Sequence, residues 1–159
     1  MSERLKIDFS AEHRLAICRP VGLVGTELVG QILHFLLAVE ECNQEPFNRL
    51  LDLTLATDIQ LSGIVLYTYA RARREATAHL LTFRTAIVAS DPDTEDVAQI
   101  YAKLMEGSKI QVRIFSDTSS AANWLGVPDK VVRSELAIRN NPFTARATDD
   151  SFPDGLPPR

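Results

Sequence analysis

The feature that most restricts the fold is a short run near the middle of the chain, Thr-Ala-Ile-Val-Ala at Thr85 to Ala89. The run shows no alternation between polar and apolar positions. A strand of this kind must be covered on both faces, which is typical of a central strand in a parallel sheet. Because parallel strands are joined by crossover connections, usually helices, the run predicts an α/β fold.

A second unit of this type runs from Leu50 to Tyr69. We predict a short strand over residues 48–53, a polar turn at 56–58 and a helix over about 61–79. In α/β sheets, ligands and partners bind just beyond the carboxyl ends of parallel strands. The turn and the start of the helix are therefore the first place to look for a functional site.

The remaining segments complete the order ββαβαβα, and residues 110–115 alternate between apolar and polar positions, which predicts a last strand. Residues 5–9 and 15–20 predict an N-terminal hairpin, and Thr26 is a candidate cap for a broad apolar helix that ends near Glu40 and Glu41. Acidic residues in the last turn oppose the helix dipole, and solvent exposure is the only reason we see for them. Further helices are expected after Ser90 and near Trp124. The sum is a mixed, mostly parallel sheet of about five strands with helical crossovers.

The domain should cover residues 1–128, followed by a C-terminal helix at 129–139. After Asn140 the composition changes, and four of the eight prolines lie in this last stretch. No apolar periodicity remains there, so we expect residues 140–159 to form a disordered tail.

Composition excludes several classes of function. The net charge of −4 and the pI of about 5.4 indicate no general attraction to nucleic acid or anionic membranes. No apolar run approaches the roughly 20 residues of a membrane span, and no secretion signal is visible. With only Cys18 and Cys42, we expect a cytoplasmic protein with reduced thiols. The cysteines and His13, His34 and His79 have no metal-ligand spacing, so we expect neither metal nor cofactor.

Three stretches carry a resemblance to a known family. They are the strand pair at residues 7–9 and 14–20; Leu51-Asp52-Leu53 with Asp58 and Ser62-Gly63; and the segments at 86–92, 101, 106–107, 112–115 and 122–126. With these residues the chain resembles the SpoIIAA-like proteins, a branch of the STAS-type fold related to bacterial anti-sigma factor antagonists. The likeness covers residues 5–128.

The resemblance implies a regulatory or interaction module more than a reaction. Sporulation-type antagonists are switched by phosphorylation of a serine at the helix start, in a pattern like Asp-Ser-Ser-Gly-Leu. Here the run is Gln60-Leu61-Ser62-Gly63-Ile64, so the modified position falls on Leu61. Only Ser62 remains as a phosphorylation candidate.

Two groups of candidate binding residues follow from the predicted strand ends. The first is Asp58 with the run Gln60, Leu61, Ser62 and Gly63, where free N–H groups at a helix start attract anions or a partner. Its alternative interpretation is a helix cap with close packing through glycine. The second is Ser90 and Asp91, whose alternative interpretation is a capped helix entry.

Arginines form a third candidate, a docking surface for an acidic partner; they are Arg71, Arg73, Arg74 and Arg84. The alternative is a solvated helix end with favourable dipole placement. Asp52 lies in a strand, but no nucleophile with a base, phosphate loop or metal cluster is apparent, so we expect no enzymatic activity. The sequence predicts a regulatory module for a protein partner or small ligand, and the apolar width of residues 26–39 predicts a homodimer.

Overall fold

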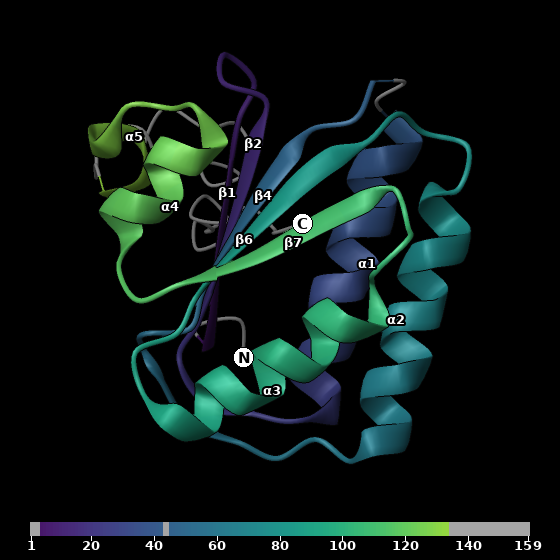
Figure 1. Cartoon of the computed structure of the whole chain (residues 1–159), viewed down its shortest axis with the longest axis vertical. Helices are drawn as coiled ribbons and strands as arrows, with labels where there is room; N and C mark the ends of the chain where they lie inside the picture. Colours follow the sequence, from purple (N-terminus) through teal and green to yellow (C-terminus); the bar gives the residue numbers. More distant parts are fainter. Residues whose placement is uncertain (1–3, 43–44, 134–159) are drawn as a thin grey trace, which may run out of the picture.

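A computed structural model describes residues 4–42 and 45–133 of the chain. Its main sheet has five strands in the order β1-β2-β4-β6-β7 (Figure 1). β1 (Leu5–Ser10) and β2 (Leu15–Pro20) pair antiparallel, whereas β4 (Asn48–Asp52), β6 (Phe83–Val88) and β7 (Ile110–Phe115) continue the sheet in parallel from β2. The predicted mixed, mostly parallel sheet with an N-terminal hairpin is confirmed.

Helices cover both faces of this sheet. On one face lie α1 (Thr26–Cys42), α2 (Gly63–Thr77) and α3 (Pro92–Leu104), and on the other lie α4 (Thr118–Leu125) and α5 (Asp129–Arg133) (Figure 1). The central strand β6 is buried as its sequence requires, with Ala86, Ile87 and Val88 at most 1% exposed. Because side chains alternate along a strand, Ile87 belongs to the core beneath α3, and Ala86 and Val88 to the core beneath α4 and α5.

Two short strands were not predicted. Residues 56–58, expected as a turn, belong to β5 (Ala56–Ile59), which pairs in parallel with β3 (Gly22–Val24) in a second, two-stranded sheet. The Gly22 N–H donates to the Leu55 carbonyl at 3.0 Å, and the Gln60 N–H donates to the Val24 carbonyl at 2.9 Å. The expected turn is wrong because the connections after β2 and β4 pair their backbone groups with each other. Strands of three and four residues are too short to display a periodicity.

Helix starts differ slightly from the prediction. Thr26 does not cap α1 but is its first residue, and the Val29 N–H donates to the carbonyl of Gly25 at 3.1 Å. The helix predicted at 129–139 is seen as α5 up to Arg133. Residues 134–139 and the tail at 140–159 lie outside the described residues. Within the described ranges, no helix is long and apolar enough to cross a membrane.

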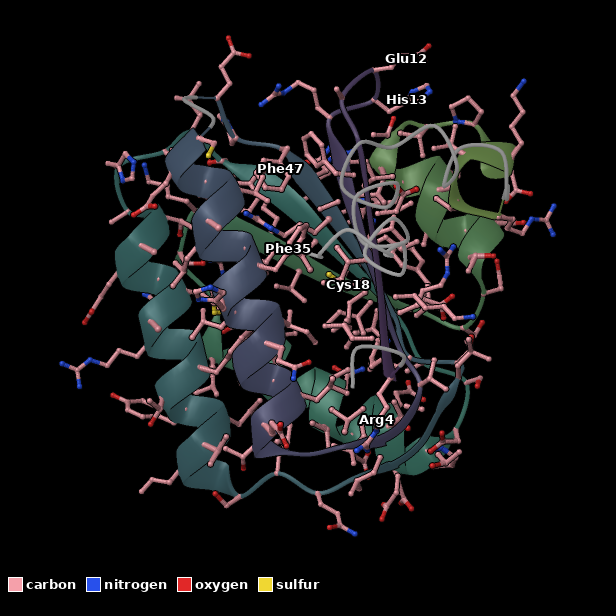
Figure 2. All side chains as sticks on the ribbon, turned by 180° about the vertical axis from the view of Figure 1, so that it is seen from behind. Arg4, Glu12, His13, Cys18, Phe35 and Phe47 are labelled. Carbon is pink, nitrogen blue, oxygen red and sulfur yellow. The ribbon has the colours of Figure 1, made fainter. Side chains whose placement is uncertain are left out.

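The two faces of the sheet have separate cores. Seen from behind, Cys18 and Phe47 lie between α1 and the sheet (Figure 2). Phe47 contacts Phe9 edge-on, with 5.3 Å between the ring centroids. On the other face, Ala121 and Ala122 of α4 pack against apolar side chains of β2, β4 and β6. The binding features described next belong to the face covered by α1, α2 and α3.

Candidate functional site

The start of α2 is a capped helix end at the surface. The Ser62 hydroxyl accepts a hydrogen bond from the Val65 N–H at 3.2 Å, so the cap interpretation is confirmed. Ser62 and Gly63 are both exposed. Close packing through glycine is wrong, because a Cβ added at Gly63 would meet no atom within 4 Å.

The neighbouring residues of this group differ in exposure. Asp58, in β5, and Gln60, in the loop, are exposed and bonded to each other, with 2.8 Å between Gln60 Nε2 and Asp58 Oδ2. Leu61 is half-buried and lines an internal cavity. In the segment before Ser62, the side chains of Ile59 and Leu61 reach the cavity, whereas Asp58 and Gln60 stay at the surface.

Ser90 and Asp91 form a second, separate motif at the beginning of α3. Both are exposed, and the Asp91 carboxylate accepts hydrogen bonds from the Thr94 N–H at 2.9 Å and from the Thr94 hydroxyl at 2.7 Å. These bonds hold the pKa of Asp91 below its usual range. The capped helix entry is confirmed. The bonds of Asp91 and of Ser62 are both local, so these two groups do not form one polar site.

The arginines of the third candidate are not one surface. Arg71 pairs with Glu75 on α2, with 3.0 Å between Nε and Oε2. Arg74 donates to two main-chain carbonyls at the end of α3. Arg84 extends from β6 toward the opposite face of the sheet and lies over the ring of Trp124, 5.1 Å from its centroid. The prediction that these four arginines form one docking surface for an acidic partner is therefore wrong.

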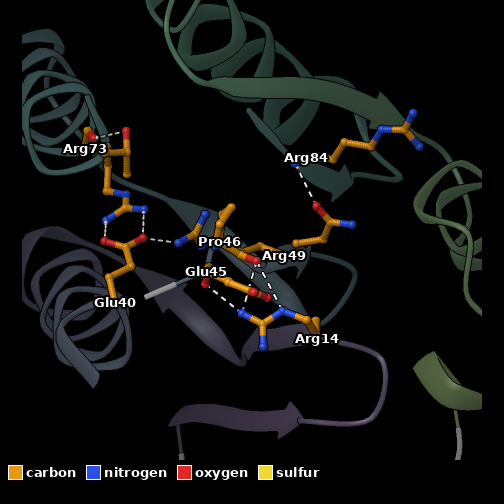
Figure 3. Close-up of polar contacts among 9 residues, drawn as sticks. Arg14, Glu40, Glu45, Pro46, Arg49, Arg73 and Arg84 are labelled. Carbon is orange, nitrogen blue, oxygen red and sulfur yellow. Dashed lines mark hydrogen bonds and ion pairs between the residues drawn. The ribbon is translucent and has the colours of Figure 1, made fainter. Parts of the chain in front are cut away.

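The fourth arginine, Arg73, belongs to a buried ionic cluster with Glu40 and Arg49 (Figure 3). Arg73 donates to both oxygens of Glu40, from Nη1 at 3.0 Å and from Nη2 at 2.5 Å. Arg49 donates to the same carboxylate from Nη2. The side chains are 1% exposed for Arg73, 6% for Arg49 and 9% for Glu40. The expected solvent exposure of Glu40 is therefore wrong, because this carboxylate compensates two buried cations.

The charge in this cluster is unbalanced at Arg49. Burial and the neighbouring Arg73 lower the pKa of the Arg49 guanidinium to about 10, although Glu40 acts to raise it. Burial also acts to lower the pKa of Arg73, but its hydrogen bonds with Glu40 hold that pKa above its usual value. Glu40 is thus committed mainly to Arg73. Within the part of the chain that the structure describes, Nε and Nη1 of Arg49 are buried and have no hydrogen-bond partner.

Two aromatic rings hold the Arg49 guanidinium in position. Its Cζ lies 4.6 Å from the ring centroid of Phe47 and 4.2 Å from that of Phe83. Such stacking is worth more for desolvated cations than for exposed ones. The rings come from the start of β6 and from the residue before β4, so the sheet itself fixes the charged group.

A cavity of about 100 Å³ lies beside this cluster, between the sheet and α1, α2 and α3. Arg49 and Arg73 line it, together with Tyr69 and Tyr101, whose rings contact each other with centroids 5.6 Å apart. Burial raises the pKa of both phenols, so both are neutral at physiological pH. The rest of the lining is mostly aliphatic and reaches Leu61.

Cys18 contributes a thiol to the lining of this cavity. It lies on β2, is 4% exposed, and has a pKa raised to about 12 by burial, which outweighs the nearby arginines. A thiol of this pKa is protonated and unreactive at neutral pH. Arg19, the next residue, faces the other side of the sheet and pairs with Asp52, with 3.2 Å between Nε and Oδ2. Within the described ranges, no group of three or more metal-ligating side chains is present.

The architecture defines the class: this chain has a SpoIIAA-like fold. Among solved structures it is similar to an uncharacterized protein of the DUF3478 family from Shewanella loihica PV-4, which is described as having that fold. The two share 17% sequence identity with a TM-score of 0.52, over 76% of this chain and 91% of the other. No family model and no curated protein matches the chain. The predicted SpoIIAA-like resemblance is confirmed for the fold.

The sequence did contain signs of the buried cluster. Glu40 opposes the dipole at the end of α1, and Arg49 lies in a short buried strand next to Leu50. Each is unfavourable alone, and their pairing compensates Glu40 fully but Arg49 only in part. The partner Arg73 is 33 residues from Glu40 and one of several arginines in its segment, so local patterns could not select it.

Proposed function

We propose that this chain is a non-enzymatic binding module that takes a small, mostly apolar molecule into the cavity beneath α1, α2 and α3. The observation that carries the proposal is the cavity itself, with a volume of about 100 Å³ and a largely aliphatic and aromatic lining. An engineered apolar cavity of about 150 Å³ in another protein stays dry and binds benzene, so this volume suits a molecule of similar or smaller size. Mostly apolar pockets with a few polar groups are typical of ligand sites.

The chemistry of the lining favours binding over catalysis. Its polar groups include two guanidiniums, two neutral phenols and a thiol with a pKa raised to about 12. None of these is an activated nucleophile with an adjacent base at neutral pH. A non-enzymatic role is therefore our proposal for this site.

Leu61 supports a regulatory output from such binding. It lines the cavity, and the exposed residues Gln60 and Ser62 flank it at the surface. A ligand that displaces Leu61 would change the surface that a protein partner meets. The proposed partner surface is therefore the one predicted from the strand end, with the cavity as its control element.

The direct test measures occupancy with benzene as the probe. Methyl resonances of Leu66 and Ile87, two cavity-lining residues, should shift on titration of the full-length protein with benzene. Ala98→Leu, which adds bulk at a buried cavity position on α3, should abolish these shifts. Gln99→Leu, the adjacent exposed position, is the matched control and should leave them unchanged. Absence of any benzene-induced shift in the unmodified protein would contradict the proposal.

Ser62 phosphorylation is the second candidate function. Its supporting observation is an exposed hydroxyl at the N-terminus of a 15-residue helix, where the helix dipole stabilises a phosphate. The test is incubation with a kinase-containing extract of the host, followed by mass spectrometry of the peptide that contains Ser62. Failure to modify Ser62, together with unchanged partner binding by Ser62→Asp, would remove this candidate.

A homodimer stays a prediction. Part of the apolar width of α1 packs on the sheet and on α2, and Leu33 and Leu37 are half-buried. Light scattering after size-exclusion chromatography tests this prediction. A dimer formed through α1 should have twice the mass of one chain at high concentration.

A further inference from the structure

The geometry points to a specific ligand class for this cavity: a small monocarboxylic acid whose carboxylate binds Arg49 and whose apolar body fills the space beside it. The inference rests on the proposed function, since it names the ligand of the same cavity.

The charge count requires one negative charge. Two guanidiniums face one carboxylate in the cluster, all of them at most 9% exposed. The cluster therefore carries a net charge of +1 away from water, which is costly unless it is compensated. Water is neutral and leaves this charge in place, and a dianion reverses its sign. A monoanion balances it.

The unpaired donors of Arg49 indicate where the compensating negative charge should lie. Both oxygens of Glu40 are already taken by Arg73, and one of them also accepts from Arg49 Nη2. Nε and Nη1 of Arg49 are buried and have no partner among the residues described. An unsatisfied buried donor is destabilising, so an acceptor beside these donors is strongly favoured. The rings of Phe47 and Phe83 both lie close to the guanidinium, with their centroids 4.6 Å and 4.2 Å from Cζ, and neither ring offers a hydrogen-bond acceptor in the plane of these donors.

The remaining lining selects an apolar body. Beside Arg49, the sheet contributes Leu51 and Ile87, and the helices contribute Leu66 and Tyr101. With about 100 Å³ available, the body is of the order of a benzene ring or a short alkyl chain. Benzoate is therefore a suitable probe, and it has neutral and cationic counterparts of the same body.

The experiment compares three head groups on one ring. Benzoate, benzamide and benzylamine are titrated into the full-length protein near pH 7 by calorimetry, with methyl shifts of Leu66 and Ile87 reporting occupancy. We expect benzoate to bind at least about tenfold more tightly than benzamide, because both accept hydrogen bonds from Arg49 but only the carboxylate also neutralises its charge. Benzylamine should not bind.

Arg49→Met tests the assignment without breaking the cluster. It leaves Glu40 and Arg73 as a one-to-one ion pair, so the variant should fold, and it should lose the preference for benzoate over benzamide. Arg84→Met is the matched control on the neighbouring strand β6, where the arginine lies over Trp124 on the opposite face. It should keep the preference.

The outcomes separate this inference from the proposed function. Equal binding of benzoate and benzamide, unchanged in Arg49→Met, overturns the carboxylate assignment and leaves a neutral apolar ligand in the cavity. Preferential binding of benzylamine also overturns it. If benzene, benzamide and benzoate all fail to bind, both the inference and the proposed function are wrong.

Discussion

The two faces of the sheet are built from the same strands yet differ in what they bury. Beneath α4 and α5, small side chains such as Ala86, Ala121 and Ala122 are at most 1% exposed and pack with larger aliphatic residues. Beneath α1, α2 and α3, the interior contains an ionic cluster and a cavity. The first face thus combines close packing with a balanced ion pair, Arg19 with Asp52, whereas the second keeps empty space and an unbalanced charge.

This difference between the two faces indicates that one face stabilises the fold and that the other is suited to binding. Interiors are normally packed at high density, and a cavity beside uncompensated charge reduces stability unless a ligand fills it. Such departures from close packing are expected at functional sites. We therefore assign the scaffold role to the α4 face and the binding role to the α1 face. The four predictions below test this assignment, in order of decreasing effect.

Removing the shared carboxylate should have the largest effect. Glu40→Gln keeps the shape of the side chain but leaves two buried guanidiniums without a counter-charge, so we expect a loss of about 3–5 kcal/mol in the free energy of unfolding. Urea denaturation measures this change. Glu75→Gln is the control, because its pair with Arg71 is exposed and should be worth no more than about 0.5 kcal/mol. Equal losses in both variants would show that the cluster is not buried.

The two thiols should differ strongly in reactivity. Cys42 is exposed, whereas Cys18 is buried with a pKa raised from 9.0 to about 12. At pH 8 the thiolate fraction of Cys18 is therefore lower than that of an ordinary cysteine by a factor of about 10³. Iodoacetamide followed by mass spectrometry should modify Cys42 alone in the native protein and both thiols in urea. Because its pKa is raised, the Cys18 thiol should become reactive only as the pH approaches 12. Rapid modification of Cys18 at pH 8 would mean that the cavity is open to water.

Adding the same side chain to each face should sharpen the contrast. Ala121→Leu inserts three carbons into the packed core beneath α4, which should destabilise the protein by about 1–3 kcal/mol. Ala98→Leu directs the same volume toward the cavity, so the change should stay within about 1 kcal/mol of zero. Thermal unfolding of the two variants measures the difference. A larger loss for Ala98→Leu would indicate that the cavity cannot accept a side chain.

The smallest effect should come from the cap of α2. Ser62→Ala removes the acceptor for the Val65 N–H and should cost about 1 kcal/mol, whereas Ser62→Asp keeps an acceptor at this position and should be close to neutral. Chemical denaturation compares them. If both variants lose the same stability, the hydroxyl has a role other than capping. A neutral Ser62→Asp variant also makes the phosphorylation test free of folding artefacts.

Several parts of this fold were predictable because their signals are local. The unbroken apolar run of β6 specified a strand buried on both faces, and the alternation in β1 specified a hairpin strand. Ser62 and Asp91 were recognised as helix caps, since capping involves residues only three apart. The turn predicted at residues 56–58 is wrong because the strand there depends on pairing with residues 22–24, which are distant in the chain.

The sequence alone thus determined the layered α/β class, the order of the main strands along the chain and the capped helix starts, because these follow from spacing between near neighbours. Only the tertiary structure decided that Glu40, Arg49 and Arg73 meet, that Arg49 keeps unpaired donors and that a cavity lies beside them. Charge pairing and empty volume depend on how α1, α2 and α3 dock on the sheet. No local pattern encodes that docking, because the energy that selects it comes from contacts between residues far apart in the chain.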